Sequence, residues 1–252
     1  MKLRSAVGVR LVQVGFVLAF LLGWYYIGSQ KLVNPLLLPR IEGVYRDFVS
    51  IVAAGQAVAN LRITMYELAI AYAIAALAGM GVGYVIGSSR FRTSVFEPLL
   101  AALYAVPIVV FFPLCVLFFG LGPASKIAFG AAFGFFPVAL NTISGFGHLD
   151  PRLVDVARSM GASSFQMFRR VLLPGALPQV LNGLRTGLIL TFIAVVAGEI
   201  VSSLQGIGYM IGWLGELMET SKMYAYILLI VFLAMALNGL LSAWGSRDRS
   251  RG

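Results

Sequence analysis

Long apolar stretches separated by short polar segments dominate the chain. Six of these stretches lie at residues 11–29, 64–87, 99–119, 126–146, 179–202 and 223–244. Each has about the 20 apolar residues that a helix needs to cross a bilayer. The alternation over about ten residues that marks transmembrane strands is absent from the sequence. The pattern therefore predicts an all-α membrane protein with six transmembrane helices.

Two weaker apolar patterns lie between the predicted spans. Ile41–Ala54 predicts a short amphipathic helix in the connection from Ser29 to Leu61. Leu204–Thr220 is apolar but contains four glycines and is too short to cross a bilayer. We expect this second segment to form a helix that lies in, or dips into, one face of the membrane, where it either gates a pore or caps the helix bundle.

Prolines and glycines inside the apolar stretches indicate where helices bend and where they touch. Pro107, Pro113 and Pro137 predict kinks or breaks in the third and fourth spans. Because broken helices commonly line a solute path in transporters, these prolines favour a path through this part of the bundle. Glycines at small-x-x-x-small spacing in the second, fourth and fifth spans predict close helix packing.

A polar segment at residues 150–178 interrupts the apolar pattern and predicts two short cytoplasmic helices. Asp150 before Pro151 predicts an N-cap followed by the first helical turn. Gly161 predicts the end of this first helix and a turn into the next one.

The second short helix is predicted to begin at a capping box formed by Ser163 and Gln166. Pro174 and Pro178 are expected to end it. Apolar side chains recur along both short helices, and the chain has no water-soluble domain to cover them. A partner protein is therefore the expected cover.

The composition indicates an integral membrane protein. The 252 residues are 60% hydrophobic and 12% charged, with a mean hydropathy of +0.90. The net charge of +9 is scattered at the ends of the apolar stretches and forms no single basic patch, so no nucleic acid partner is expected. One cysteine (Cys115) and one histidine (His148) cannot build a disulfide or a multi-residue metal site. We expect no metal or cofactor in this chain.

The distribution of Lys and Arg predicts the orientation of the chain. Twelve lie on the side that contains both termini and the polar segment, and six lie on the other side. By the positive-inside rule, the N-terminus (1–10), the 150–178 segment and the tail (246–252) are cytoplasmic. The first span, 11–29, lacks a clear cleavage site and is expected to be a retained membrane anchor.

The polar segment resembles the EAA motif of bacterial ABC importer permeases. That motif runs E-A-A, three residues, glycine, nine residues, Ile or Val, one residue and Leu-Pro. The chain has Asp155-Val156-Ala157, Gly161, Val171 and Leu173-Pro174 at the matching spacing. Asp and Val replace Glu and the first Ala, and they keep the acidic and small apolar character.

The resemblance extends over residues 35–245. The further matching segments are Leu37–Pro39, Gly83–Arg90, Phe112–Leu114, Phe118–Gly122, Phe135–Pro137, Gly183–Arg185 and Gly198–Ile200. They are similar to the branch that imports nitrate, sulfonates, taurine, bicarbonate-type solutes, aromatic acids and pyrimidine precursors of thiamine. Thr64–Glu67 stands where sulfonate-type members tend to have S-L-x-R, so Glu67 favours pyrimidine-precursor or flavin-type members over carriers of anions.

The resemblance implies a type I importer permease (MetI-like) fold. Its core permease domain would be residues 64–245, with coupling helices in the 150–178 loop that dock into a groove of the ATPase subunit. The residues that the motif assigns to ATPase coupling are Asp155, Ala157 and Gly161, with Ser163, Ser164 and Phe165 in the docking surface.

The resemblance also implies the partners. The chain has no G-x-x-x-x-G-K-[ST] sequence, so ATP and Mg are expected on a partner ATPase. A homodimer in the bacterial inner membrane, with two ATPase subunits on its cytoplasmic side and a periplasmic solute-binding protein, is the implied assembly. The identity of the solute stays open.

Charged side chains at membrane depth cost about 2.5–3.5 kcal/mol at a helix centre, so each needs a role. Glu67 is expected either to line an outer vestibule or to anchor at the interface, and Glu199 to form a structural pair or a gate contact. Arg185 is expected to snorkel or to pair near the coupling segment. The candidates for the pathway or its gate are Glu67, Glu199, Pro107 and Tyr209.

Two other classes of protein remain as alternatives. An ion-gradient-driven secondary transporter would carry inverted repeats and a carboxylate relay at the midplane. A membrane-embedded enzyme would need a cluster of catalytic or metal-binding groups. Neither pattern is evident in the sequence.

Overall fold

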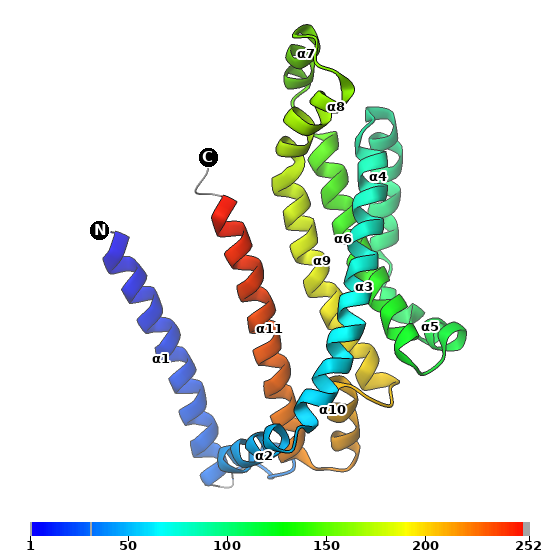
Figure 1. Ribbon diagram of the computed structural model, residues 1–252. Coiled ribbons are helices and arrows are strands. Elements are labelled where there is room, and N and C mark those ends of the chain that lie inside the picture. Colours follow the sequence, from blue (N-terminus) through cyan, green and yellow to red (C-terminus); the bar gives the residue numbers. More distant parts are fainter. Residues whose placement is uncertain (1, 31, 249–252) are drawn as a thin grey trace. The chain divides into compact units, whose positions relative to one another are not determined.

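The computed structural model describes residues 2–30 and 32–248, and every element within those two ranges is a helix (Figure 1). The all-α prediction is confirmed. The described residues form two compact units, residues up to 59 together with 210–234, and residues 60–209 together with 235–248. Most of the predicted tail, 249–252, and residue 1 lie outside the described residues.

The first unit contains α1 (Lys2–Ser29), α2 (Ile41–Ala53) and the first half of α11 (Thr220–Asp248). The indole of Trp24 donates a hydrogen bond to Pro39 O (2.9 Å) and lies against Tyr224, with ring centroids 5.5 Å apart. The Tyr224 hydroxyl donates to Leu37 O (3.0 Å). The amphipathic helix predicted at residues 41–54 is therefore present as α2, and the connection before it is bound to α1 and α11.

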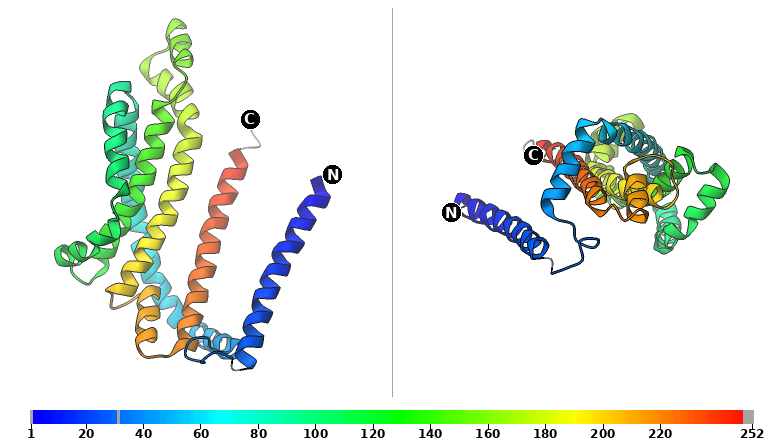
Figure 2. Two further views of the ribbon diagram at one scale, coloured as in Figure 1. Left: turned by 180° about the vertical axis from the view of Figure 1, so that it is seen from behind. Right: turned by 90° about the horizontal axis from the view of Figure 1, so that it is seen from below.

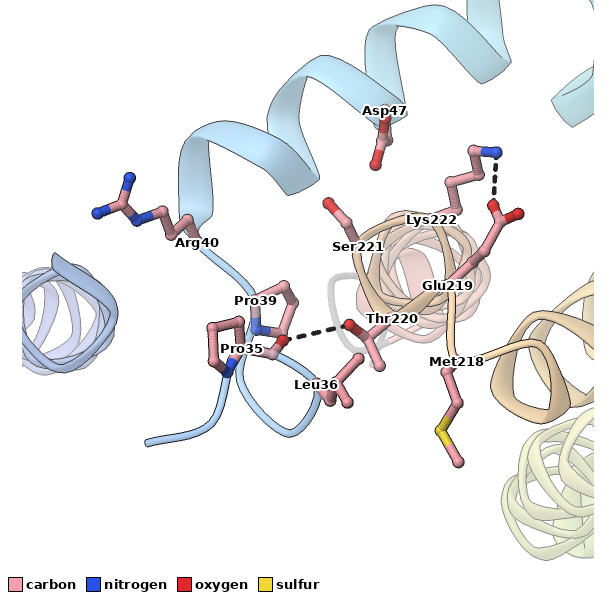
Figure 3. Close-up of a pocket in the computed structure, with 10 residues that line it drawn as sticks. All are labelled: Pro35, Leu36, Pro39, Arg40, Asp47, Met218, Glu219, Thr220, Ser221 and Lys222. Carbon is pink, nitrogen blue, oxygen red and sulfur yellow. Dashed lines mark hydrogen bonds and ion pairs between the residues drawn. The ribbon is translucent and has the colours of Figure 1, made fainter. Parts of the chain in front are cut away.

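An open pocket of about 430 Å³ lies in this first unit, between the segment before α2 and the start of α11 (Figure 3). Thr220 Oγ1 donates to Pro35 O (3.3 Å) across it. Lys222 Nζ lies 2.5 Å from Glu219 Oε2, so a charge in the first turn of α11 is neutralised by the residue just before the helix. The pocket is therefore bordered by groups that already bind one another.

The second unit contains α3 (Gln56–Gly87, from Asn60 on), α4 (Arg90–Ala105), α5 (Phe112–Phe119), α6 (Pro123–Gly147) and α9 (Leu173–Val201). The helices α6 and α9 lie side by side along most of their length (Figures 1 and 2). Glycines allow this close approach. A Cβ on Gly134 of α6 would lie 2.1 Å from Thr191 Oγ1 of α9. Likewise α3 lies close to α6, because a Cβ on Gly83 would lie 2.5 Å from Thr142 Cβ. The predicted packing through small residues is confirmed.

Within residues 2–30 and 32–248, five helices are long and apolar enough to cross a membrane, and a sixth span results if one bent pair is counted. The first agrees with its predicted bounds, as Leu11–Ser29. Gln56–Gly87 and Pro123–Gly147 contain the predicted second and fourth spans, and Thr220–Gly239 overlaps the predicted sixth. The count of six is therefore supported, with the third span as the bent pair.

The third span, predicted at 99–119 with a kink or break at its prolines, begins earlier, at Arg90, and is broken into two parts. The chain forms α4 and then the short 3-10 turn Ile108–Phe111 with α5, and the two parts are bent by 73°. Val106 is extended (ψ 131°) because the ring of Pro107 excludes the helical conformation from the residue before it. The predicted break is confirmed at Pro107.

Neither of the other two prolines breaks a helix, which was one of the two outcomes predicted for them. Pro113 lies in the first turn of α5, where a helix has no use for the missing N–H. Pro137 lies inside α6, which continues through it from Pro123 to Gly147. Of the three predicted breaks, only Pro107 therefore separates two helices.

Candidate functional site

The polar segment begins with α7 (Pro151–Ser159), which is capped at both ends. Asp150 Oδ1 accepts a hydrogen bond from Arg152 N (2.9 Å), as an N-cap does. Gly161 has φ +73°, and Ala162 N donates to Ala157 O (3.0 Å), which is the hydrogen bond of a Schellman motif. The first predicted helix and its glycine end are confirmed.

The next helix, α8 (Ser164–Met167), begins at the predicted capping box. Ser163 N donates to Gln166 Oε1 (2.9 Å), and Gln166 N donates back to Ser163 Oγ (3.3 Å). This reciprocal pair fixes the direction in which the chain leaves the glycine turn.

The prediction that Pro174 and Pro178 end the second helix is wrong. A π-helical turn at Phe168–Leu172 joins α8 to α9, and the helix runs on through both prolines as one 38-residue stretch, Ser164–Val201. A wide π turn absorbs the hydrogen bond that a proline cannot donate, so a helix can continue where a regular α turn would stop.

Apolar side chains at the tip of this segment are exposed. Met160 is 82% exposed and Phe165 is 69% exposed. The predicted coupling residues Asp155, Gly161, Ser163 and Ser164 are exposed on the same two helices, and Ala157 is half-buried. Figure 1 shows α7 and α8 at one end of α9.

Aromatic packing anchors the base of the polar segment in the second unit. The ring of Phe168 lies 5.4 Å from Tyr84 and 6.4 Å from Phe146, and Met167 is buried beside it. The exposed tip therefore stands on a packed base, which suits a surface that receives a partner and transmits its displacement.

A second group of functional candidates lies inside the protein. Glu67 on α3, Lys126 on α6 and Glu199 on α9 are 1%, 0% and 0% exposed. Glu67 and Glu199 are hydrogen-bonded through their carboxyl groups, and Lys126 interacts electrostatically with both. Glu67 was predicted to lie in an outer vestibule or at the membrane interface, and the structure instead encloses it between helices.

Glu199 holds the turn between α9 and α10 (Ile207–Glu216). Its Oε2 accepts from Gly208 N (2.7 Å), and its Oε1 accepts from Thr64 Oγ1 (2.8 Å). Ile207 N donates in turn to Thr64 Oγ1 (3.0 Å). The structural pair expected for Glu199 is therefore present, and it includes backbone groups of the turn.

Lys126 was missed by sequence reasoning, which counted it among the six charges of the outer loops. Its ammonium donates to the carbonyls of Leu121 and Gly122, just before α6. Its isolation was the available signal, since Lys126 is the only residue among Asp, Glu, Lys and Arg between Glu97 and Asp150. A lone charge in so long an apolar stretch indicates a buried partner.

The other two candidates for the pathway or its gate are Pro107 and Tyr209. Pro107 is exposed at the break between α4 and α5, and Tyr209 is half-buried in the first turn of α10. Arg185 Nη2 donates to Asn238 Oδ1 (3.0 Å), which is a pairing as expected but with α11. The pathway role of Pro107 and Tyr209 stays a prediction.

Comparison with known proteins matches residues 75–247 to the family model described as "Binding-protein-dependent transport system inner membrane component". The chain is 32% identical over 206 residues to the putative aliphatic sulfonates transport permease protein of Bacillus subtilis, covering 82% of the chain and 75% of that relative. It is 31% identical over 232 residues to the taurine transport system permease protein of Escherichia coli, covering 90% and 84%. A riboflavin transport system permease protein of Chloroflexus aurantiacus is 35% identical, over 60% of the chain and 58% of the relative.

Solved structures with a similar fold are inward-facing conformations of the methionine ABC transporter MetNI. One crystal form gives a TM-score of 0.60 at 18% identity, covering 72% of this chain and 90% of that one. A second gives a TM-score of 0.55 at 18% identity, covering 84% and 96%.

Proposed function

Since the chain belongs to the family of binding-protein-dependent transport inner membrane components, we propose that its α7–α8 tip is where a partner ATPase drives it. The chain is a multi-pass permease subunit of an ABC importer, with the helical fold seen in the methionine transporter. Family and fold favour this function over an ion-gradient-driven secondary transporter.

The observation that carries the proposal is the continuous helix from the tip into the membrane-spanning region. The 38 residues Ser164–Val201 measure about 55 Å at 1.5 Å per residue. A helix of this kind transmits a displacement of its end, whereas a flexible loop would absorb it. Asp155, Ala157 and Gly161 shape the first helix of the tip, and Ser163, Ser164 and Phe165 form the start of the continuous helix.

The test is co-purification of the ATPase with a variant at Phe165. Phe165→Ala removes a 69% exposed ring from the tip, and we expect the amount of ATPase captured per permease to fall at least tenfold. Phe118→Ala is the matched control, because Phe118 is a 76% exposed ring on α5. Undiminished capture with Phe165→Ala, or equal losses in both variants, would contradict the proposed docking site.

We propose the assembly and orientation on the same basis. The permease forms a homodimer in the bacterial inner membrane, with ATP and Mg on the ATPase subunits and a periplasmic binding protein that delivers the solute. Both termini and the 150–178 segment face the cytoplasm. The enclosure of Lys126 supports this orientation, because it lowers the opposing count of basic residues from six to five, against twelve.

An organic sulfonate is the proposed class of solute. Two relatives that cover 82% and 90% of this chain are named as an aliphatic sulfonates permease and a taurine permease. The sequence argument against an anion rested on Glu67, and this carboxyl lies 1% exposed beside Lys126 instead of facing a vestibule. Glu67 therefore no longer argues against an anionic solute. The riboflavin permease relative supports a flavin as the second candidate.

A further inference from the structure

The first turn of α10 is held by three side chains from other helices. Gly206 N donates to Asn60 Oδ1 (3.2 Å), Ile207 N to Thr64 Oγ1 (3.0 Å) and Gly208 N to Glu199 Oε2 (2.7 Å). These three consecutive N–H groups begin a helix and have no partner within it. Glu199 also places its carboxylate at the positive end of the α10 dipole. We call Asn60, Thr64, Glu67, Lys126 and Glu199 the clasp.

The hydrogen atoms of the clasp can be assigned from these bonds. The Thr64 oxygen accepts from Ile207 N, so its own hydrogen is free to go to a neighbour. Glu199 Oε1 is the nearest acceptor at 2.8 Å, compared with 3.3 Å to Asn60 O. Because Gly208 N supplies a second hydrogen at Oε2, Glu199 accepts at both oxygens. That is the pattern of an ionised carboxylate.

Glu67 then has to be the donor to Glu199. Two carboxyl groups can form a hydrogen bond only if one of them carries a proton, and Glu199 is already an acceptor on both sides. The other Glu67 oxygen, Oε2, is buried without a hydrogen-bond partner, as a neutral carboxyl tolerates better than a charged one.

Charge balance gives the same assignment. With Glu67 neutral, the enclosed group contains one negative charge on Glu199 and one positive charge on Lys126. With both glutamates ionised, it would contain an uncompensated negative charge in a place that water does not reach, which is strongly unfavourable.

We propose that Glu67 is a positioning residue whose carboxyl group is protonated and donates a hydrogen bond to Glu199. Through this bond, the clasp fixes the turn Ser202–Gly206 and the first turn of α10 to α3, α6 and α9. The residue touches no solute in this role. The clasp holds one end of α9, and the α7–α8 tip lies at the other.

The first test compares Glu67→Gln with Glu67→Leu in the assembled transporter. The glutamine amide is neutral and can still donate to Glu199, whereas leucine has a similar size and cannot. Both variants are made in a chain in which Cys115→Ser removes the native cysteine and Gln205→Cys places a new one in the turn. The rate at which a membrane-impermeant maleimide labels this new cysteine measures how accessible the turn is. We expect labelling to stay within twofold of the parent for Glu67→Gln and to rise at least fivefold for Glu67→Leu. Equal rates in the two variants would overturn the proposal.

The second test detects the proton itself. Infrared spectra of the assembled transporter contain the carbonyl stretch of any protonated carboxylic acid, and we expect this band to be weaker in Glu67→Gln than in the wild type. Glu42→Gln, at an exposed glutamate of α2, should leave the band unchanged. An unchanged band in Glu67→Gln would overturn the assignment. Neither test uses a solute or counts ATPase, so failure here would leave the proposed function in place.

Discussion

Among the glycines that the structure describes, Gly206 combines a positive φ with a neighbour too close for a Cβ. Its φ of +108° lies in a region that residues with a side chain rarely adopt, and a Cβ there would lie 2.2 Å from Glu199 Oε1. Because glycine has no Cβ at this position, the Glu199 carboxylate has room to lie there. One backbone position decides whether the clasp can close.

Gly206→Ala is expected to destabilise the permease by about 3 kcal/mol or more, from backbone strain plus the displaced hydrogen bonds of Glu199. Gly120→Ala is the matched control, since Gly120 has φ +76° with no atom within 4 Å of the added Cβ. With ψ −172°, Gly120 lies in a region open essentially to glycine alone, so Gly120→Ala should cost about 2 kcal/mol from strain without a clash. The midpoints of thermal unfolding in detergent measure both. Similar midpoints for the two variants would mean that Glu199 can move aside freely.

The clasp also shows which residue contacts the sequence could not predict. Thr64 and Glu199 bind each other although 135 positions separate them. Isolated charges in apolar stretches indicated that Glu67 and Glu199 needed partners, but no local pattern states which helices meet. The caps of α7 and α8 were predicted correctly because Asp150 and Ser163 bind backbone groups within three residues of themselves.

Among helices, the prediction succeeded where one residue dictates the conformation. Pro107 forces an extended residue before it and separates α4 from α5. Pro174 and Pro178 gave the same signal, yet the helix continues through them, because the π turn before Leu173 changes the hydrogen-bond pattern. At this turn Phe168 packs against Tyr84 of α3 and Phe146 of α6, and a single-sequence pattern does not contain such contacts.

The N-cap of α7 can be tested on its own helix. Asp150→Ala removes the acceptor of Arg152 N, and we expect the first turn of α7 to lose about 1 kcal/mol of protection. Hydrogen exchange of peptides covering residues 151–155 should become about fivefold faster. Asp155→Ala removes a carboxylate from the middle of the same helix and should change this rate less than twofold. Equal acceleration by both would show that charge, and not capping, holds the turn.

For the whole molecule, the sequence predicted the class of protein and its helical fold correctly, and it left the solute open. The assignment of residues 150–178 to ATPase coupling stays a prediction. The EAA-like motif lies within 20 residues, so it can be recognised from the local sequence alone. Recognition of the solute involves a separate binding protein. Glu67, which was expected in an outer vestibule or at the membrane interface, is 1% exposed in the structure. The motifs predicted the branch of the family, and the solute class proposed within that branch had to come from the relatives.

The proposed solute class can be tested with the cognate periplasmic binding protein. Titration calorimetry against taurine, an alkanesulfonate, nitrate, a pyrimidine and riboflavin should give micromolar or tighter binding for a sulfonate and at least 100-fold weaker binding for the others. The same order should appear in solute-stimulated ATP hydrolysis by the complete transporter. Tightest binding of riboflavin would replace the sulfonate proposal with the flavin one.

The unbroken helix Ser164–Val201 has a consequence for the angle between its two ends. Each residue of an α-helix turns the chain by about 100°, so inserting one residue in α9 would rotate Glu199 by that amount relative to Phe165. Seven residues make nearly two whole turns and would leave an error of only about 20°. An insertion or deletion in α9 therefore keeps Phe165 and Glu199 in their relative orientation only if it adds or removes about seven residues. For the same reason, the helix transmits a rotation applied at Phe165 as well as a displacement along its axis.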